Sequence, residues 1–324
     1  MQHHIGVDIS KKDFYACFNE QDEPIKFNND HVGIRNFIKY LNTNQYSIHD
    51  TVIGVESTGA YHLPLSLICS QNNYPIKVIN PLLITKKQNQ TGVRRVKNDK
   101  KDSRLIRHCL TTGAGYQFCE TNDSLILKNL VRQRDYLSDT KRRLNLKQQD
   151  ISYKETYLKC KITTVNSEIS LIIAKKIKQI EKELKQYDPA TQKLLRSIPG
   201  IGPITAVSFI SEVANIQRFK TSKQLTAYIG LDSRVHQSGT SIQGKGYITK
   251  RGNKILRTRL FNAASVAVLH PNMFQSFFQK KRSEGKPYRV ALVATMHKMV
   301  KVVFAVWTRN TPFVDQLPPT QKEG

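Results

Sequence analysis

The stretch from residue 116 to residue 187 contains neither glycine nor proline, and an apolar residue recurs in it at every seventh position. A heptad repeat without helix breakers predicts long α-helices that pack along one face. The companion heptad positions are mostly polar, so the apolar seam is narrower than that of a self-sufficient dimeric coiled coil. The apolar series is Leu130, Leu137, Leu144, Ile151, Leu158, Val165 and Ile172, and the polar companions are Arg134, Lys141, Gln148 and Glu155. We therefore expect a coiled-coil-like linker at residues 116–190, built as a helical hairpin or a loosely paired stalk, and association into a homo-oligomer (a dimer or a tetramer).

The sequence before this linker alternates between strand-like and helix-like segments. Short apolar runs predict strands at residues 5–10, 14–18, 51–56 and 76–80, and helical spacing predicts helices at residues 32–41 and 61–70. A polar turn at residues 11–13 joins the first two strands into a hairpin. This alternation predicts an α/β domain with a parallel element over residues 1–115.

Residues 191–324 are predicted to form a mainly helical domain. Near its start, Gly200 and Gly202 flank an isoleucine between two helical segments. This spacing is typical of a helix-hairpin-helix element, whose backbone amides bind a phosphate at a helix start. A plain interhelical turn is the alternative.

The charge balance indicates the kind of partner. The chain has 51 Lys and Arg against 25 Asp and Glu, a formal net charge of +26, which is far more than solubility requires. Because the basic residues are interleaved with ordinary apolar segments, a folded nucleic-acid-binding protein is favoured over a disordered basic tail or a membrane-surface protein. We expect neither a membrane span nor a signal peptide, and hence a cytoplasmic, nucleoid-associated protein.

Clustered basic residues are the candidates for phosphate contacts. One group lies in a polar segment that is expected to be a basic loop, and the other follows the glycine-flanked serine discussed below. The candidates are Lys86, Lys87, Arg94, Arg95, Lys97, Lys250, Arg251, Lys254 and Arg257. The five cysteines form no Cys-x-x-Cys pair and are odd in number, so they are expected to be reduced thiols. The adjacent histidines His3 and His4 lack a third ligand nearby and are read as incidental.

Four acidic residues stand out because carboxylates are scarce in this chain. Asp8 lies in an apolar strand, Glu56 ends another, and Asp99 and Asp102 are three apart at a helix start. In a ribonuclease-H-like sheet the first and fourth strands are neighbours, which would bring these carboxylates together around a divalent cation, expected to be Mg²⁺. Taken singly, each has an ordinary alternative as a turn cap, a solvated strand end or a helix-start charge.

A serine near clustered cations is the candidate nucleophile. Ser238 precedes a glycine, and Lys250, Arg251 and Arg257 follow at a short distance in sequence. A serine hydroxyl that attacks a phosphodiester needs cations to hold the phosphate oxygens. Ser241, three residues later, is an alternative nucleophile, and a solvated turn is the structural alternative for the whole run.

These segments together resemble a known family. The motifs Gly6–Lys11, Val55–Gly59, Lys97–Asp102, Ile198–Gly202 and Ser238-Gly239 with Lys250–Asn253 are similar, in this order, to those of the DEDD transposases of insertion sequences of the 110 type. The resemblance implies a RuvC-like N-terminal domain with Asp8, Glu56, Asp99 and Asp102 as its acidic residues. It also implies a coiled-coil linker, a C-terminal transposase domain with Ser238 as nucleophile, and a non-coding bridge RNA that pairs with donor and target DNA.

Three other functions compete with this interpretation. A RuvC-like junction nuclease would use Mg²⁺ and water, with Ser238 structural. A non-catalytic scaffold would only bind RNA or DNA. An actin-like ATPase also opens with an Asp-bearing hairpin, but no second phosphate loop supports it. A protein–DNA adduct would separate the transposase from the other three.

Overall fold

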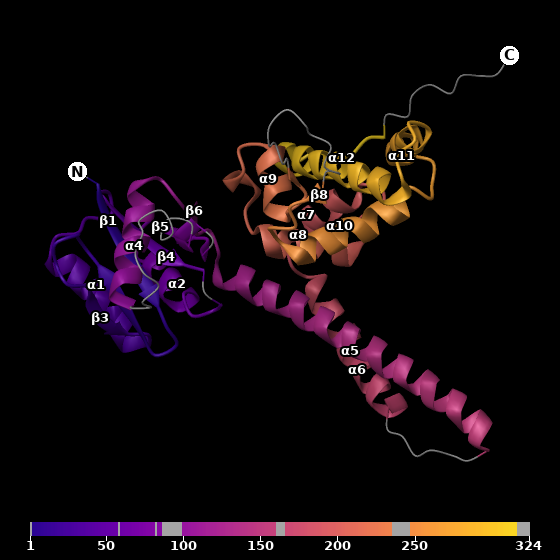
Figure 1. Cartoon of the computed structure of the whole chain (residues 1–324), viewed down its shortest axis with the longest axis horizontal. Helices are drawn as coiled ribbons and strands as arrows, with labels where there is room; N and C mark the ends of the chain where they lie inside the picture. The colour runs from indigo at the N-terminus through magenta and orange to yellow at the C-terminus, as the bar shows by residue number, and fades with distance from the viewer. Residues whose placement is uncertain are drawn as a thin grey trace, which may run out of the picture. The chain divides into compact units, whose positions relative to one another are not determined.

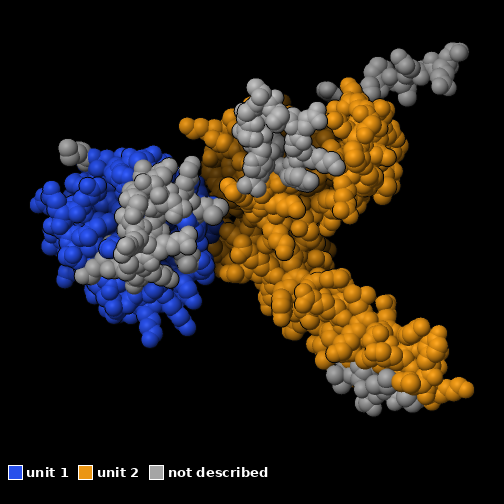
Figure 2. Space-filling view, in the orientation of Figure 1, with its two compact units in different colours: residues 1–122 blue, residues 123–324 orange. Residues whose placement is uncertain are grey.

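The computed structural model describes residues 2–57, 59–81, 83–85, 99–159, 166–234 and 247–315. At positions 99, 100, 233, 234 and 247 it describes the backbone but not the side chain. The chain divides into two compact units, residues 1–122 (unit 1) and residues 123–324 (unit 2), which Figure 2 shows in two colours.

Unit 1 is built on a six-stranded sheet with the order β3-β2-β1-β4-β5-β6. The strands are β1 (His3–Ile9), β2 (Asp13–Cys17), β3 (Ile25–Asn28), β4 (Thr51–Glu56), β5 (Ile76–Ile79) and β6 (Tyr116–Gln117). β1 pairs in parallel with β4, and β4 pairs in parallel with β5, whereas β2, β3 and β6 join the sheet antiparallel. The expectation that the strands of Asp8 and Glu56 are neighbours is therefore confirmed, and the pairing of β1 with β4 supplies the expected parallel element. β3 and β6 were not predicted, because each is short and neither carries a run of buried residues.

Helices cover both faces of this sheet (Figure 1). The helices of unit 1 are α1 (His31–Thr43), α2 (Leu63–Gln71) and α4 (Asp99–Thr111). α1 begins where Asp30 accepts a hydrogen bond of 2.7 Å from the backbone N–H of Gly33. α1 and α2 pack on Ile5, Val7 and Val55 through buried side chains such as Phe37 and Leu65. α4 packs on the opposite face, where Ile106 and Leu110 contact Val52 and Ile79.

Unit 2 combines a helical hairpin with a helical bundle (Figure 1). Its helices are α5 (Asn122–Leu158), α6 (Asn166–Leu184), α7 (Pro189–Arg196), α8 (Pro203–Val213), α9 (Ser222–Ile229), α10 (Lys254–Ala267), α11 (Met273–Ser283) and α12 (Tyr288–Arg309), with a short 3₁₀ helix at Ile216–Arg218 and a two-stranded ribbon of β7 (Ser233–Arg234) and β8 (Tyr247–Ile248). The second domain is thus mainly helical, as predicted.

α5 and α6 form an antiparallel pair. Arg134 of α5 contacts Glu181 of α6 at 2.7 Å, and Ser170 of α6 donates a hydrogen bond of 2.7 Å to Asn145 of α5. The heptad positions of α5 from 130 to 155 are half-buried, both the apolar and the polar ones, while Leu158 is 64% exposed and Ile172 is 60% exposed. The repeat therefore marks the packed face of α5 from position 130 to position 155 and not beyond. Val165 lies outside the described residues.

Among the described residues, one helix is long and apolar enough to cross a membrane by length and composition alone. This helix is α12, with 22 residues. Its buried residues, such as Met296, Val300 and Val303, belong to the main core of unit 2. They pack against α9, α10 and α11. The apolar composition of α12 is that of a helix at the centre of a bundle.

The described cysteines are free thiols, as expected. Cys17, Cys69 and Cys109 are buried and Cys119 is half-buried. Burial raises the pKa of Cys69 far above its ordinary value, which makes this thiol unreactive. Cys160 lies outside the described residues.

Candidate active site and nucleic-acid interface

Asp8 and Glu56 are neighbours at the same end of the sheet. The parallel register pairs Gly6 with Gly54 and Val7 with Val55, and Asp8 and Glu56 follow these pairs by one residue. Side chains alternate along a strand, so both carboxylates point to the face that Gly6 and Gly54 share. Each is partly exposed. The sequence analysis expected this juxtaposition from the strand arrangement of a ribonuclease-H-like sheet.

α4 lies on that same face in unusually close contact. A Cβ atom added to Gly6 would lie 2.2 Å from the carbonyl oxygen of Ser103, and one added to Gly54 would lie 2.4 Å from the Leu110 side chain. Such distances are shorter than any real contact, so only glycine at these two positions lets the helix lie directly on the strands. Arg107 fixes the helix further, because its Nε donates a hydrogen bond of 3.0 Å to the carbonyl oxygen of His4.

α4 crosses the two strands that carry Asp8 and Glu56. Ser103 and Arg107 lie over Gly6 of β1, and Leu110 lies over Gly54 of β4, at the level where these two glycines pair. Asp99 and Asp102 belong to the first turn of this helix, which packs on the face of the sheet to which Asp8 and Glu56 point.

Carboxylate oxygens are the ligands that Mg²⁺ prefers, so the donor set fits this ion. Within the residues that the structure describes, no three His, Cys, Asp or Glu side chains gather closely enough to hold a metal ion. The side chain of Asp99, the fourth member of the predicted set, is not described. The backbone thus puts the four positions on one face of the sheet, and the four-carboxylate site stays a prediction.

Several predicted site residues fall outside the described residues. Neither candidate nucleophile, Ser238 or Ser241, is described, and the same holds for the basic group at positions 86–97. The undescribed members of that group are Lys86, Lys87, Arg94, Arg95 and Lys97.

The chain on either side of the serine segment is held together by backbone hydrogen bonds. β7 and β8 pair antiparallel, with Ser233 opposite Ile248. Beyond this pair, the amide of Thr249 donates to the carbonyl oxygen of Asp232 at 2.8 Å, and the amide of Lys250 donates to that of Gly230 at 3.1 Å. The chain that precedes residue 235 and the chain that follows residue 246 are therefore joined at one place in unit 2.

A tight turn presents the next basic residues. Lys250 has a φ of 54° and is exposed, as is Arg251. Gly252 lies against the preceding segment so closely that a Cβ there would be 2.5 Å from the carbonyl oxygen of Tyr228. Asn253 then caps α10 by accepting a hydrogen bond of 3.0 Å from the amide of Leu256. The turn thus directs two cations into solvent.

The two basic residues that follow differ in their surroundings. Arg257 is half-buried, and its Nη1 donates a hydrogen bond of 2.9 Å to the carbonyl oxygen of Ile229. Lys254, in the first turn of α10, is exposed. Lys254 is therefore the better placed of the two for a phosphate contact, and Arg257 also has a structural role.

Glu212 was missed by the sequence reasoning. This carboxylate of α8 is 1% exposed and accepts hydrogen bonds from Arg132 of α5, at 3.0 and 3.2 Å, and from Asn253, at 2.6 Å. It therefore connects α5 to the turn that carries Lys250 and Arg251. A carboxylate inside the apolar run of residues 203–213 was the available signal, because a buried charge requires a partner.

His297 of α12 lies beside Leu231 and Asp232, the two residues that precede β7. Burial lowers its pKa from the ordinary value of 6.5, and Lys301 adds to this effect, whereas the backbone of Leu231 and the Asp232 carboxylate oppose it. The imidazole is therefore neutral at pH 7.

The two glycines of the predicted helix-hairpin-helix element have different environments. Gly200 has a φ of 85° and packs on α10, where an added Cβ would lie 2.2 Å from the carbonyl oxygen of Ala263. Gly202 precedes α8 in an extended conformation and is exposed. Close packing on α10 accounts for the glycine at position 200, which agrees with the alternative of a plain interhelical turn. Phosphate binding by either glycine stays a prediction.

Known proteins resemble this chain over both units. Residues 5–151 match the family model of the DEDD transposases of the IS110 type, and residues 192–279 match the model of the Transposase IS116/IS110/IS902 family. The pilin gene-inverting protein of Moraxella lacunata is 27% identical over 322 residues, which cover 96% of this chain and 97% of that protein. The transposase for insertion sequence element IS1111A of Coxiella burnetii is 36% identical over 138 residues, 41% of this chain and 38% of that protein.

Proposed function

Because this chain belongs to the DEDD transposases of insertion sequences of the 110 type, and is thus a DNA transposase, we propose that it cuts and rejoins DNA strands through a phosphoserine intermediate. One observation carries the unit 1 part of this proposal. The strand register sets Asp8 beside Glu56, and α4, whose first turn carries Asp99 and Asp102, packs on the face to which both of these carboxylates point.

Asp8, Glu56, Asp99 and Asp102 are proposed to hold Mg²⁺. The ion would supply stabilisation of the negative charge that develops on the phosphate. Before it binds, the carboxylates of the set repel one another, which raises the free energy of the empty site. Glycines 6 and 54 have the role of keeping the helix-borne carboxylates at the strand ends.

Ser238 is proposed as the nucleophile. Its hydroxyl oxygen attacks the phosphorus, a serine–phosphate bond forms, and the bond to one sugar oxygen breaks, so that the leaving strand ends in a hydroxyl. The serine proton passes to a base, and rejoining occurs when a strand hydroxyl attacks the phosphoserine. Lys250, Arg251 and Lys254 hold the phosphate oxygens. Two observations support this assignment. Backbone hydrogen bonds join the chain on the two sides of the serine segment, and these three cations are exposed.

The proposed partners are donor DNA, target DNA and a non-coding bridge RNA, with the chain acting as a homo-oligomer on the nucleoid in the cytoplasm. Base pairing with the RNA would select the sequence, while the protein binds backbone and shape. The net charge of +26 supports a polyanionic partner.

The test is a strand-transfer assay with labelled donor and target DNA, the bridge RNA and Mg²⁺, quenched and run on a denaturing gel. Wild-type protein should give a covalent protein–DNA adduct and recombinant product, and Ser238→Ala should give neither while still binding nucleic acid. Ser241→Ala is the matched control and should retain substantial activity. An adduct that persists in Ser238→Ala but disappears in Ser241→Ala would transfer the role to Ser241. Nicking by the wild type without any adduct would favour a junction nuclease that uses water.

A further inference from the structure

A groove of about 540 Å³ lies between α5 and α10 of unit 2. Four of the side chains that line it are cationic, Arg134, Arg142, Lys254 and Arg259, and two are acidic, Asp135 and Asp139. Only Lys254 among them belongs to the site proposed above. The lining therefore has an excess of positive charge.

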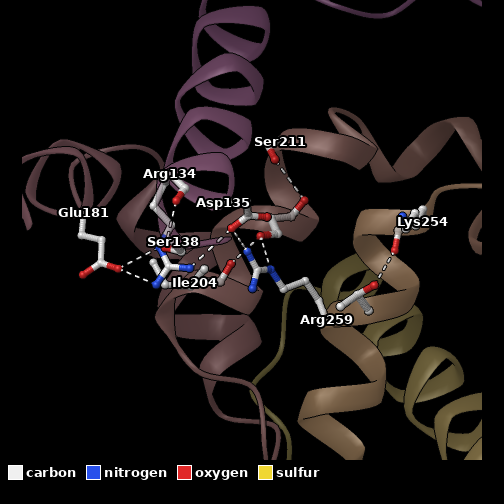
Figure 3. A network of polar contacts seen from close by, with 10 residues as sticks. Arg134, Asp135, Ser138, Glu181, Ile204, Ser211, Lys254 and Arg259 are labelled. Atoms are coloured by element: carbon white, nitrogen blue, oxygen red, sulfur yellow. Dashed lines mark hydrogen bonds and ion pairs between the residues drawn. The ribbon is translucent and has the colours of Figure 1, made fainter. Parts of the chain in front are cut away.

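The inner part of the groove is a network of paired charges, which Figure 3 shows from close by. Arg259 of α10 contacts Asp135 of α5 and donates a hydrogen bond of 3.2 Å to Ser208 of α8. Arg134 donates to Glu181 at 2.9 and 2.7 Å. The two arginine side chains are only 15% and 20% exposed. These pairs fasten the helices, and each inner carboxylate already has an arginine.

The outer part of the groove has more cationic side chains than carboxylates. Arg142 is 65% exposed and shares the single carboxylate of Asp139 with Arg143, at 2.7 and 2.8 Å, so one positive charge there is not balanced. The two arginines hold the pKa of Asp139 below its usual range, which keeps this carboxylate charged. Lys254 is exposed on the facing helix and makes no ion pair within the described residues.

Two neutral polar side chains also line the groove. Thr258 and Asn262 follow Lys254 along α10 at helical spacing and are exposed. The Thr258 hydroxyl donates to the carbonyl oxygen of Lys254 at 3.0 Å, so the amide of Asn262 is the neutral donor for the phosphates and sugars of a nucleic acid. None of the described residues that line the groove is aromatic, so none of them offers a ring on which a base would stack.

We propose that this groove binds the sugar–phosphate backbone of a nucleic acid strand, with Arg142 and Lys254 as the phosphate ligands and Asn262 as a supporting donor. The inference deepens the proposed function, on which it rests, because it adds a contact made by α5, outside the segments assigned to chemistry. Since the contacts are to backbone only, the groove positions the strand and does not select its sequence.

The experiment measures the affinity of the full chain for a labelled 30-base-pair DNA duplex and for a labelled single-stranded RNA, each over a series of salt concentrations. In the double variant Arg142→Gln with Lys254→Gln, the slope of log affinity against log salt should fall by about 0.9 per lost contact on the duplex, or about 0.7 on a single strand. Affinity should fall roughly tenfold per contact at 0.1 M salt. The strand type whose slope changes identifies the ligand.

Two further variants keep the test decisive. Asn262→Asp adds one negative charge to the groove with almost no change in volume and should also weaken binding, without touching the inner network. Lys175→Gln with Lys178→Gln, at two exposed positions of α6, removes the same charge elsewhere and should leave the slope nearly unchanged. An unchanged slope in the groove variants, with steep salt dependence in the wild type, would overturn the groove and the phosphate contact of Lys254, and would leave the proposed nucleophile and metal site standing. A wild type that does not bind either probe would overturn both.

Discussion

Unit 1 and unit 2 hold their charged side chains in place by different means. In unit 1 the candidate metal-binding carboxylates are positioned by backbone packing, because α4 lies directly on Gly6 and Gly54 of two paired strands. In unit 2 the basic turn and the groove are positioned by arginine–carboxylate contacts, chiefly those of Glu212 and Asp135.

The difference corresponds to the two proposed tasks. A metal site requires ligands held within a few tenths of an ångström, and close backbone packing provides this without depending on salt or pH. A surface that binds nucleic acid backbone tolerates more variation, and long arginine side chains suit it. We therefore expect substitutions at the packed glycines of unit 1 to act through steric fit and those at the ion pairs of unit 2 to act through charge.

The largest expected effect is the loss of strand cleavage in Asp8→Asn. The change removes a ligand charge with almost no change in volume. Loss of a residue that only supports a metal ligand lowers activity roughly 10- to 100-fold. Loss of a ligand itself should lower activity by more than this. Thermal stability without metal should be equal or higher, because carboxylate repulsion is relieved. Cleavage of labelled DNA in Mg²⁺ measures the first effect and thermal unfolding the second.

Asp30→Asn is the matched control in the same unit. Asp30 caps α1, and asparagine caps helices equally well, so activity and stability should both be retained. Full cleavage by Asp8→Asn would contradict the carboxylate site.

Gly6→Ala should destabilise unit 1 strongly. The new Cβ would lie 2.2 Å from a backbone oxygen of α4, so the helix must shift, at a cost of about 3 kcal/mol for such overpacking. Gly113→Ala is the control, since its added Cβ meets nothing within 4 Å. Only the left-handed φ of 79° opposes it, at about 1 kcal/mol. Denaturant unfolding would show the order, and equal losses would mean that α4 does not lie on the strand as closely as described.

Glu212→Ala should destabilise unit 2 less than Gly6→Ala destabilises unit 1. It removes the acceptor for Arg132 and Asn253, and a charge-assisted hydrogen bond is worth about 1.5 to 3 kcal/mol. Arg132 is 52% exposed, so water compensates part of the loss, and we expect about 2 kcal/mol in all.

Glu183→Ala, an exposed carboxylate of α6, is the control and should change the free energy of unfolding by less than about 0.5 kcal/mol. Glu212→Ala should in addition weaken nucleic-acid binding, because Asn253 ends the turn that carries Lys250 and Arg251. Unaltered stability and binding would show that the turn is positioned without Glu212.

Much of unit 1 could be predicted from the sequence. The apolar runs around Asp8 and Glu56 identify their strands, and the order of elements in the chain leads to their parallel pairing, which the register confirms. The long helix was also predictable, because a stretch without glycine and proline and with a heptad repeat has few alternatives. What these features share is that they depend on neighbours in the sequence.

Other features depend on partners far away in the chain. Gly6 and Ser103 are 97 positions apart, and neither segment by itself predicts that a helix crosses the strand at Gly6. The partners of Glu212 are on α5 and α10, so a carboxylate inside an apolar run could be recognised as unusual but not assigned a role. The groove between α5 and α10 likewise exists only because two helices with unremarkable charged faces are packed together.

The sequence by itself determined the family, the order of the candidate carboxylates and the excess of positive charge, because motifs, strand order and composition are local or additive properties. Only the tertiary structure decided which face of the sheet α4 covers, which basic residues are already occupied by a chain partner, and where unit 2 has a charged groove. These depend on packing between segments distant in the chain, whose geometry is set by the whole core at once.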